Sequence, residues 1–284
     1  MINTDLNRKL RDLLNDGNCY NPATIFNPLS ARMASDVGFK LGIIPGRIIS
    51  LDYLSEPDLM LLTLSELTET VRRITKNSKI PLIVDADNGY GNALNVKRTV
   101  ESLEDAGVSG ISLEDTDLPI QFGTPKKPNF LDLKEATKKI KIAIDSRKDI
   151  STCIIARTGC YPHTGFDDMI ERGKAYELEG ADAIFYVNVN SKDHIYKIAN
   201  YHNVPIILGN NSTEIPLEEL ANMGISVSLP GHKAYFVAMQ AYKDAIQRLL
   251  ETGNFSDYNI DMDKIGELSN EDEYSNLIDK YMKG

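Results

Sequence analysis

Short apolar runs alternate with longer amphipathic stretches along most of the chain. The runs are nearly continuous and rich in β-branched residues, which is typical of parallel strands that are covered on both faces. This pattern predicts eight strands, at residues 23–26, 41–44, 82–85, 110–113, 153–157, 183–187, 205–208 and 226–229. Between them, apolar residues at helical spacing predict helices at residues 65–75, 95–106, 133–147, 167–179, 216–222 and 233–252.

Eight strands alternating with helices over about 230 residues indicate an α/β fold, and we predict a closed (β/α)8 TIM-type barrel. A doubly wound open sheet has the same periodicity. However, the glycine-rich turn that a dinucleotide-binding sheet needs after its first strand is missing. Residues 1–250 are therefore expected to form a single barrel domain. Residues 251–284 turn acidic and then regain apolar spacing, which predicts a C-terminal helical appendage that packs on the barrel or on a neighbouring subunit.

Composition narrows the range of partners. The 284 residues carry 31 Lys and Arg against 41 Asp and Glu, a formal charge of −10, and such an acidic surface disfavours nucleic acid and anionic membranes. No apolar run approaches the ~20 residues that span a bilayer, and the N-terminus has no signal-peptide core. The three scattered cysteines do not form a disulfide framework, so a reducing, cytoplasmic setting is expected.

Carboxylates gather where the third and fourth strands end. Asp85 and Asp87 lie two residues apart, so in an extended chain both point to the same side, and the next strand ends in Glu114 and Asp115. In a barrel these ends meet at the C-terminal face, where a hard divalent cation would offset their repulsion. Oxygen ligands without His or Cys favour Mg²⁺, with Mn²⁺ as the alternative. Asp85 and Asp87 could instead only cap the turn that follows them.

Two basic residues and one loop are expected at the same face. Arg157 ends the fifth strand and suits a substrate carboxylate or phosphonate, or else pairs with the acids. His232 follows the eighth strand and either transfers protons or caps the last helix. His194 and His202 are expected on an outer helix. The loop after the fourth strand is either a mobile lid or a plain surface connection. Its candidate lid residues are Gln121, Phe122, Gly123, Thr124 and Lys126.

Taken together, several motifs resemble the isocitrate lyase/phosphoenolpyruvate mutase superfamily between about Asn18 and Leu250. They are Asp85-Ala-Asp-Asn-Gly-Tyr-Gly-Asn92, LEDT at residues 113–116, IIART at 154–158 and GADA at 180–183. The resemblance implies a (β/α)8 barrel that binds an α-keto acid through Mg²⁺ and forms or breaks a bond beside the ketone. It also implies a homotetramer, a dimer of dimers, in which the last barrel helix is exchanged between subunits.

The resemblance also implies roles for individual residues. Asp85 would ligate the metal directly, Asp87 and Glu114 mostly through ordered water, and Asp58 from the outer shell. Arg157 would hold the substrate carboxylate. The lid lacks the cysteine of isocitrate and methylisocitrate lyases, and Phe122 stands where the mutases have an asparagine.

The most similar pattern is that of the bacterial oxaloacetate decarboxylase branch, in GYGNALNV, LEDTxLPxQFG and GHxAYF, the last of which contains His232. The implied reaction is Mg²⁺-dependent decarboxylation of oxaloacetate, or a close α-keto acid analogue, to pyruvate and CO₂ through an enolate. Arg157 and His232 would be the catalytic residues.

The substrate side departs from that pattern. The substrate-binding loop after the second strand, a small Gly/Ser-rich turn in the family, here reads Ile44-Pro-Gly46-Arg47-Ile48, so Arg47 adds a cation and bulk beside Gly46. The turn Gly209-Asn-Asn-Ser212 is shorter and lacks a tyrosine. Arg47 either recognises a larger or more anionic substrate or forms a surface salt bridge. A phosphonopyruvate hydrolase, a phosphoenolpyruvate mutase, a 2-methylisocitrate or dimethylmalate lyase, and a non-catalytic keto-acid binder therefore remain alternatives.

Overall fold

The computed structural model describes residues 2–123, 128–210, 214–255 and 258–283. The chain divides into two compact units, Met1–Gly231 and His232–Gly284, and each is described by itself. The expected division into residues 1–250 and 251–284 stays a prediction.

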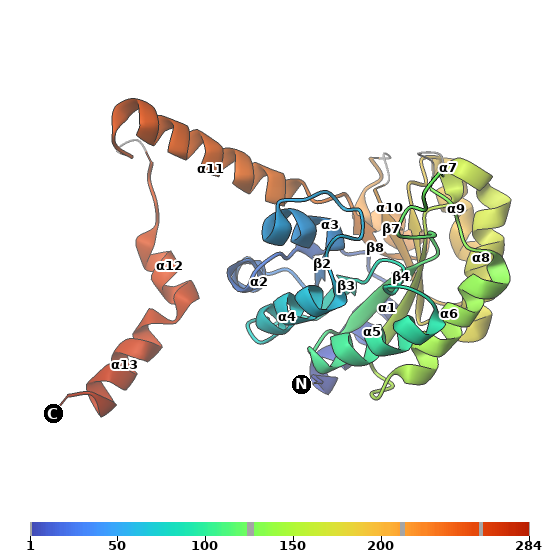
Figure 1. The fold of residues 1–284 in the computed structure, drawn as a ribbon, viewed down its shortest axis with the longest axis horizontal. Helices are drawn as coiled ribbons and strands as arrows, with labels where there is room; N and C mark the ends of the chain where they lie inside the picture. Colours follow the sequence, from blue (N-terminus) through green and yellow to red (C-terminus); the bar gives the residue numbers. More distant parts are fainter. Residues whose placement is uncertain (1, 124–127, 211–213, 256–257, 284) are drawn as a thin grey trace. The chain divides into compact units, whose positions relative to one another are not determined.

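The first unit is a parallel β-barrel surrounded by helices (Figure 1). Its strands pair in chain order and are β1 (Ala23–Thr24), β2 (Gly42–Ile44), β3 (Leu82–Asp85), β4 (Gly110–Glu114), β5 (Cys153–Thr158), β6 (Ala183–Val187), β7 (Ile206–Gly209) and β8 (Ile225–Leu229). A parallel bridge between Tyr20, just before β1, and Val227 of β8 joins the two edges. The closed barrel predicted from the sequence is confirmed, and the open sheet is not.

Most helices of this unit follow the strands and cover the outside of the barrel, whereas the first helix precedes β1. They are α1 (Thr4–Asn15), α2 (Pro28–Asp36), α3 (Gly46–Ile49), the π-helix η1 (Ser50–Leu54), α4 (Leu64–Thr75), α5 (Ala93–Asp105), α6 (Leu133–Ser146), α7 (Tyr161–Thr164), α8 (Phe166–Glu179), α9 (Lys192–Ile198), the 3₁₀ turn η2 (Ala199–Tyr201) and α10 (Leu217–Asn222). Capping residues define several helix ends. Thr63 and Glu66 form a reciprocal capping box at α4, and Gly180 ends α8 in the left-handed conformation.

Apolar side chains form two layers, one between strands and helices and one inside the barrel. Leu10 and Leu14 of α1 belong to the interior layer, so this helix packs across the N-terminal end of the barrel. Arg11 fixes it there, because its guanidinium donates to the carbonyls of Ile150 and Ser151 and pairs with Asp182 at 2.8 Å. The opposite, C-terminal end of the barrel is left for the strand-end residues.

A buried histidine links α8 to β6 on the outside of the barrel. His202 follows η2, so the expectation that it lies on an outer helix is wrong. Its side chain is fully buried, with Nε2 2.7 Å from the Tyr186 hydroxyl and Nδ1 2.8 Å from Glu177 Oε2. Burial lowers the pKa of His202, and the Glu177 carboxylate opposes this shift only in part.

We therefore expect the free energy of unfolding to fall as the pH is lowered below about 6.5, the usual pKa of an unfolded histidine. The unfolded chain then binds a proton that folded His202 resists, so the stability present above this pKa is lost in acid. Glu177, whose pKa is lowered on balance although burial raises it, adds to the same trend at lower pH. Urea unfolding of His202→Gln between pH 5 and 7.5 should show a flatter dependence than wild type. His163→Gln, at an exposed position, serves as the control, and an unchanged slope in His202→Gln would contradict the assignment.

The second unit consists of α11 (Lys233–Thr252), α12 (Met262–Ser269) and α13 (Glu271–Tyr281). The helix predicted at residues 233–252 is confirmed. Many apolar side chains of this unit are exposed, among them Val237, Tyr242 and Leu250 on α11. None of the helices in the described part of the chain is long and apolar enough to cross a membrane.

Candidate active site

Three charged side chains meet at the C-terminal end of β3, β4 and β5. Glu114 of β4 pairs in register with Arg157 of β5, and Asp85 ends β3, the strand on the other side of β4. Arg157 Nη1 lies 2.5 Å from Asp85 Oδ2, and Nη2 lies 3.0 Å from Glu114 Oε2. The guanidinium thus bridges two carboxylates, which is the acid-partner role that the sequence left open. Its carbon also lies 5.6 Å from the centre of the Phe185 ring.

Asp87 lies in the loop that follows β3 rather than in an extended strand. The strand ends at Asp85, and Asp87 has a φ of +47° because the chain turns sharply there. Its amide donates to Asp85 Oδ1 at 3.3 Å, so Asp85 does cap this turn. The carbonyl of Asp87 accepts from the Glu114 amide at 2.8 Å, which ties the loop to the end of β4.

Four carboxylates share one electrostatic environment here. Burial raises the pKa of Asp87 well above its usual range, and the charges of Asp85, Asp58 and Glu114 raise it further, while Arg157 opposes them. Burial likewise raises the pKa of Glu114, again against Arg157. Asp58 has a raised pKa through burial and the Asp85 charge. We call Asp58, Asp85, Asp87 and Glu114 the acid cluster. The single guanidinium of Arg157 does not balance the negative charge of these four carboxylates.

The acid cluster suits a hard divalent cation by its chemistry, since all its donors are carboxylate oxygens. Gly46 leaves room beside it: a Cβ on Gly46 would lie 3.4 Å from both carboxylate oxygens of Asp87. Within the described residues, however, no three His, Cys, Asp or Glu side chains already form a metal-binding group. Arg157 holds one oxygen of Asp85 and one of Glu114 instead. The residues fit a cation that would share these acids with Arg157.

Adding a methyl group at position 46 should weaken metal binding without disturbing the fold. In Gly46→Ala the new Cβ would cover the Asp87 carboxylate at van der Waals distance, and we expect the Kd for Mn²⁺ to rise about tenfold. Isothermal titration calorimetry measures this directly. The matched control is Gly159→Ala, which follows β5 and has no heavy atom within 4 Å of the new Cβ. Equal Mn²⁺ affinity in the two variants would rule out a metal next to Asp87.

The remaining predicted site residues lie outside the acid cluster. Arg47, in α3, is exposed, and its charge acts on Asp58, whose pKa it lowers against burial. Gln121 donates to Asp117 at 3.0 Å, and the Phe122 side chain is fully exposed. The predicted lid residues Thr124 and Lys126 lie outside the described residues. His232 comes directly before α11 and belongs to the second unit, so its catalytic role stays a prediction.

Sequence reasoning missed the side chains behind β4. Asp115, the residue after Glu114, is buried and contacts Arg172 and Tyr176 of α8. The sequence placed Asp115 with Glu114 among the strand-end carboxylates, but no sequence signal connects it to a helix more than fifty residues later, and the structure pairs it with that helix instead of the acid cluster.

Comparison with known proteins decides the family. The sequence pattern of the family described as phosphoenolpyruvate phosphomutase matches residues 10–250, which is most of the chain. The chain belongs to the phosphoenolpyruvate phosphomutase family. Every candidate site residue named above lies within the matched range, so the family match includes the acid cluster, Arg157, the lid residues and His232.

Relatives within the family carry a more specific name. An oxaloacetate decarboxylase from Rhodopseudomonas palustris (strain BisB18) is 42% identical over 239 residues, which cover 84% of this chain and 83% of the relative. An oxaloacetate decarboxylase from Pseudomonas entomophila (strain L48) is 43% identical over 245 residues, 86% of this chain and 84% of that one. The predicted resemblance to this branch of the superfamily is confirmed.

A solved structure of the family supports the fold. A phosphonopyruvate hydrolase in complex with oxalate and Mg²⁺ superposes with a TM-score of 0.88 and 27% identity, covering 100% of both chains. The barrel and the helices around it are thus those of the phosphoenolpyruvate phosphomutase family.

Proposed function

We propose that this protein is a divalent-metal-dependent decarboxylase that converts oxaloacetate to pyruvate and CO₂. The observation that supports this most strongly is the similarity to oxaloacetate decarboxylases, at 42–43% identity over more than four fifths of the chain. The acid cluster and Arg157 supply the charges that such a reaction needs at one end of the barrel. We propose Mg²⁺ as the ion, as in the related hydrolase complex, with Mn²⁺ as a substitute.

The reaction breaks the bond between C3 and C4 of oxaloacetate. CO₂ leaves, the bonding electrons move into an enolate of pyruvate, and a proton then adds to C3. A divalent ion held by Asp85, Asp87 and Glu114, with Asp58 outside them, would supply Lewis-acid stabilisation of the developing negative charge.

Arg157 is proposed to hold the C1 carboxylate of the substrate. Its guanidinium lies at the centre of the site, and its Nε–H is buried without an acceptor among the described residues. A planar guanidinium binds a carboxylate with two parallel hydrogen bonds, which would orient the keto acid. The backbone at Gly46 and the side chain of Arg47 are proposed to contact the far end of the substrate.

His232 is proposed to orient the leaving carboxylate or to move the proton to C3. An imidazole can do either at neutral pH, because its ordinary pKa lies near 6.5. In His232→Ala we expect kcat to fall more than KM rises. A raised KM at unchanged kcat would make His232 a uniform binding contact instead.

The deciding assay follows both oxaloacetate loss and pyruvate formation with Mg²⁺, against a control with metal ion alone. We expect an enzyme-dependent rate that a chelator abolishes. Phosphonopyruvate, assayed for phosphate release, and 2,3-dimethylmalate, assayed for two organic acids, test the related activities in parallel. Turnover of one of these without turnover of oxaloacetate would overturn the proposal, and binding of a keto acid without any turnover would indicate a sensor.

We also propose a homotetramer in which α11 is exchanged between subunits, and a cytoplasmic location. The exposed apolar side chains of α11 support the first proposal, because such surfaces are normally covered. The three unpaired, buried cysteines support the second. Size-exclusion chromatography with light scattering, on the full chain and on Val237→Glu, tests the assembly: the variant should form smaller species.

A further inference from the structure

A second polar cluster lies directly behind the end of β4, on the outside of the barrel. Its centre is Asp115, whose side chain is only 3% exposed. The Tyr176 hydroxyl donates to Asp115 Oδ2 at 2.5 Å, and Arg172 Nη1 donates to the same oxygen at 3.1 Å. Both partners come from α8, so two side chains of one helix hydrogen-bond to the residue that follows Glu114.

The same arginine also holds the segment that returns from the loop after β4. Arg172 Nη1 donates to the carbonyl of Leu131 at 3.0 Å, and the Leu131 amide donates to the carbonyl of Asp115 at 2.9 Å. An antiparallel bridge between Thr116 and Phe130 lies next to these bonds. The outgoing and returning limbs of the loop are therefore tied to each other and to α8 at the level of Asp115.

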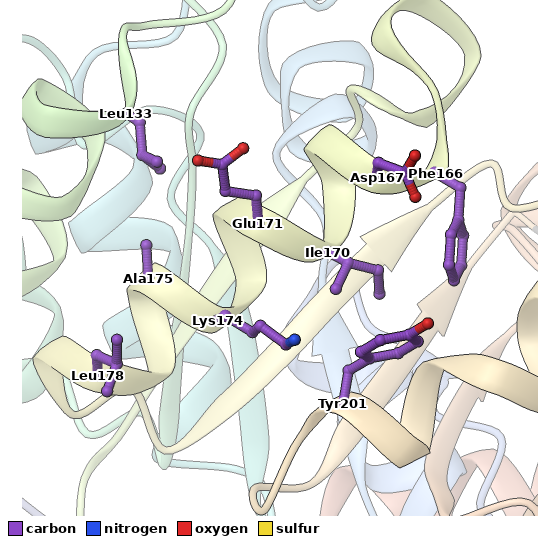
Figure 2. A pocket seen from close by; sticks show the side chains of 9 residues that line it. All are labelled: Leu133, Phe166, Asp167, Ile170, Glu171, Lys174, Ala175, Leu178 and Tyr201. Carbon is purple, nitrogen blue, oxygen red and sulfur yellow. The ribbon is translucent and has the colours of Figure 1, made fainter.

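Arg172 is set apart from its neighbours on α8 by the face it occupies. Glu171, Lys174 and Leu178 line an outward groove of about 520 Å³ (Figure 2), whereas the Arg172 side chain is 9% exposed and faces β4. Its guanidinium carbon lies 5.9 Å from the centre of the Phe130 ring, and its Nε donates to Asp168 at 3.1 Å. The guanidinium is thus held from several sides, which makes it a rigid support.

We propose that Arg172 is a positioning residue for the acid cluster: by holding Asp115 and Leu131 it fixes the backbone that carries Glu114. Neighbouring residues at a strand end cannot move independently. If Asp115 loses its hydrogen bond to Arg172, its backbone can shift and move Glu114 away from Asp85 and Arg157. Groups that orient a ligand in this way typically change metal affinity or activity by about 10- to 100-fold when they are altered. The kinetic part of this proposal rests on the proposed decarboxylation, and the Mn²⁺ part rests on the divalent-ion site proposed at the acid cluster.

The test compares two buried arginines with similar surroundings. Arg147 pairs with Asp182 and donates to the carbonyl of Thr152, but at the N-terminal end of the barrel, and the Arg147 side chain is 8% exposed. In Arg172→Lys the ammonium keeps the charge but cannot reproduce the fork of the guanidinium. We expect its Kd for Mn²⁺ and its kcat to worsen about 10-fold or more, with a smaller change in KM. In Arg147→Lys both should stay within about twofold of wild type, although its melting temperature falls as well.

Several outcomes would overturn the proposal. If Arg172→Lys lowers only the melting temperature and keeps wild-type Mn²⁺ affinity, Arg172 is a structural residue like Arg147. Tyr176→Phe, which removes one hydrogen bond to Asp115, should weaken Mn²⁺ binding by a smaller factor, and it replaces Arg172→Lys if that variant does not fold. If wild-type protein does not turn over oxaloacetate, the proposed function fails, but the Mn²⁺ titration still decides the role of Arg172.

Discussion

Replacing Asp85 with alanine is expected to lower kcat/KM for oxaloacetate on the order of 10³-fold and to remove detectable Mn²⁺ binding. The variant would lose a proposed metal ligand and, at the same time, the 2.5 Å partner of Arg157. The freed guanidinium would then turn fully to Glu114, so the remaining carboxylates would be less able to bind a cation. Steady-state kinetics and calorimetry of the purified variant measure the two effects separately.

A surface acid provides the control for this experiment. Glu69 on α4 pairs with Arg72 and Arg73, and its side chain is 52% exposed. Exposed pairs of this kind contribute little, so Glu69→Ala should keep wild-type kinetics and Mn²⁺ affinity. Near-normal activity in Asp85→Ala would show that the metal assignment is wrong, whatever the control does.

The second large effect is expected for Arg157→Met. Without a bound ion, Asp85 and Glu114 would lose their guanidinium while remaining only 17% and 12% exposed. Leaving buried charge without its partner costs roughly 3 kcal/mol of unfolding free energy. Mg²⁺ should restore part of this loss, because a cation at the acid cluster would replace the missing positive charge. Activity should stay low, since the proposed carboxylate-binding group is gone.

Urea unfolding with and without saturating Mg²⁺ checks this prediction. Arg157→Lys is the informative companion, because it keeps the charge and removes the planar fork. We expect it to be more stable than Arg157→Met without Mg²⁺ but equally poor in catalysis. If Mg²⁺ stabilises Arg157→Met no more than it stabilises wild type, the ion does not replace the missing guanidinium and binds somewhere other than the acid cluster.

Most of the barrel could be predicted from the sequence because parallel strands covered on both faces leave a strong local signal. β3 and β6 match their predicted ranges, and β4 and β5 are each one residue longer. The helices α3 and α7, of four residues each, carry too few turns for periodicity to reveal them. Helices α2 and α9 were also not predicted, although the shorter α10 was. His202 was misplaced because a short polar segment does not show that its side chain will be buried against β6.

Part of the acid cluster was predictable for a geometric reason, because successive parallel strands end at the same face, whereas Asp58 was assigned only from the family resemblance. That rule predicts that Asp85, Glu114 and Arg157 lie together, and the ion pairs of Arg157 with both acids confirm it. It could not show that the arginine would pair with both acids, since side-chain pairing depends on register. It also could not find Arg172, which lies 57 residues from Asp115 along the chain.

The packing of α1 across the N-terminal end of the barrel has a consequence for the order of assembly. Arg11 can form its ion pair only after Asp182, 171 residues later, has been synthesised. The carbonyl of Leu14 can accept its hydrogen bond only after Ser226, 212 residues later, has been synthesised. At about 5–20 residues per second, the ribosome takes roughly 10–30 s to make the chain between Arg11 and Asp182. Helix α1 is therefore synthesised well before its partners Asp182 and Ser226, and it is among the last segments to be fixed. During that interval Leu10 and Leu14 lack the apolar partners on later strands that cover them in the folded barrel.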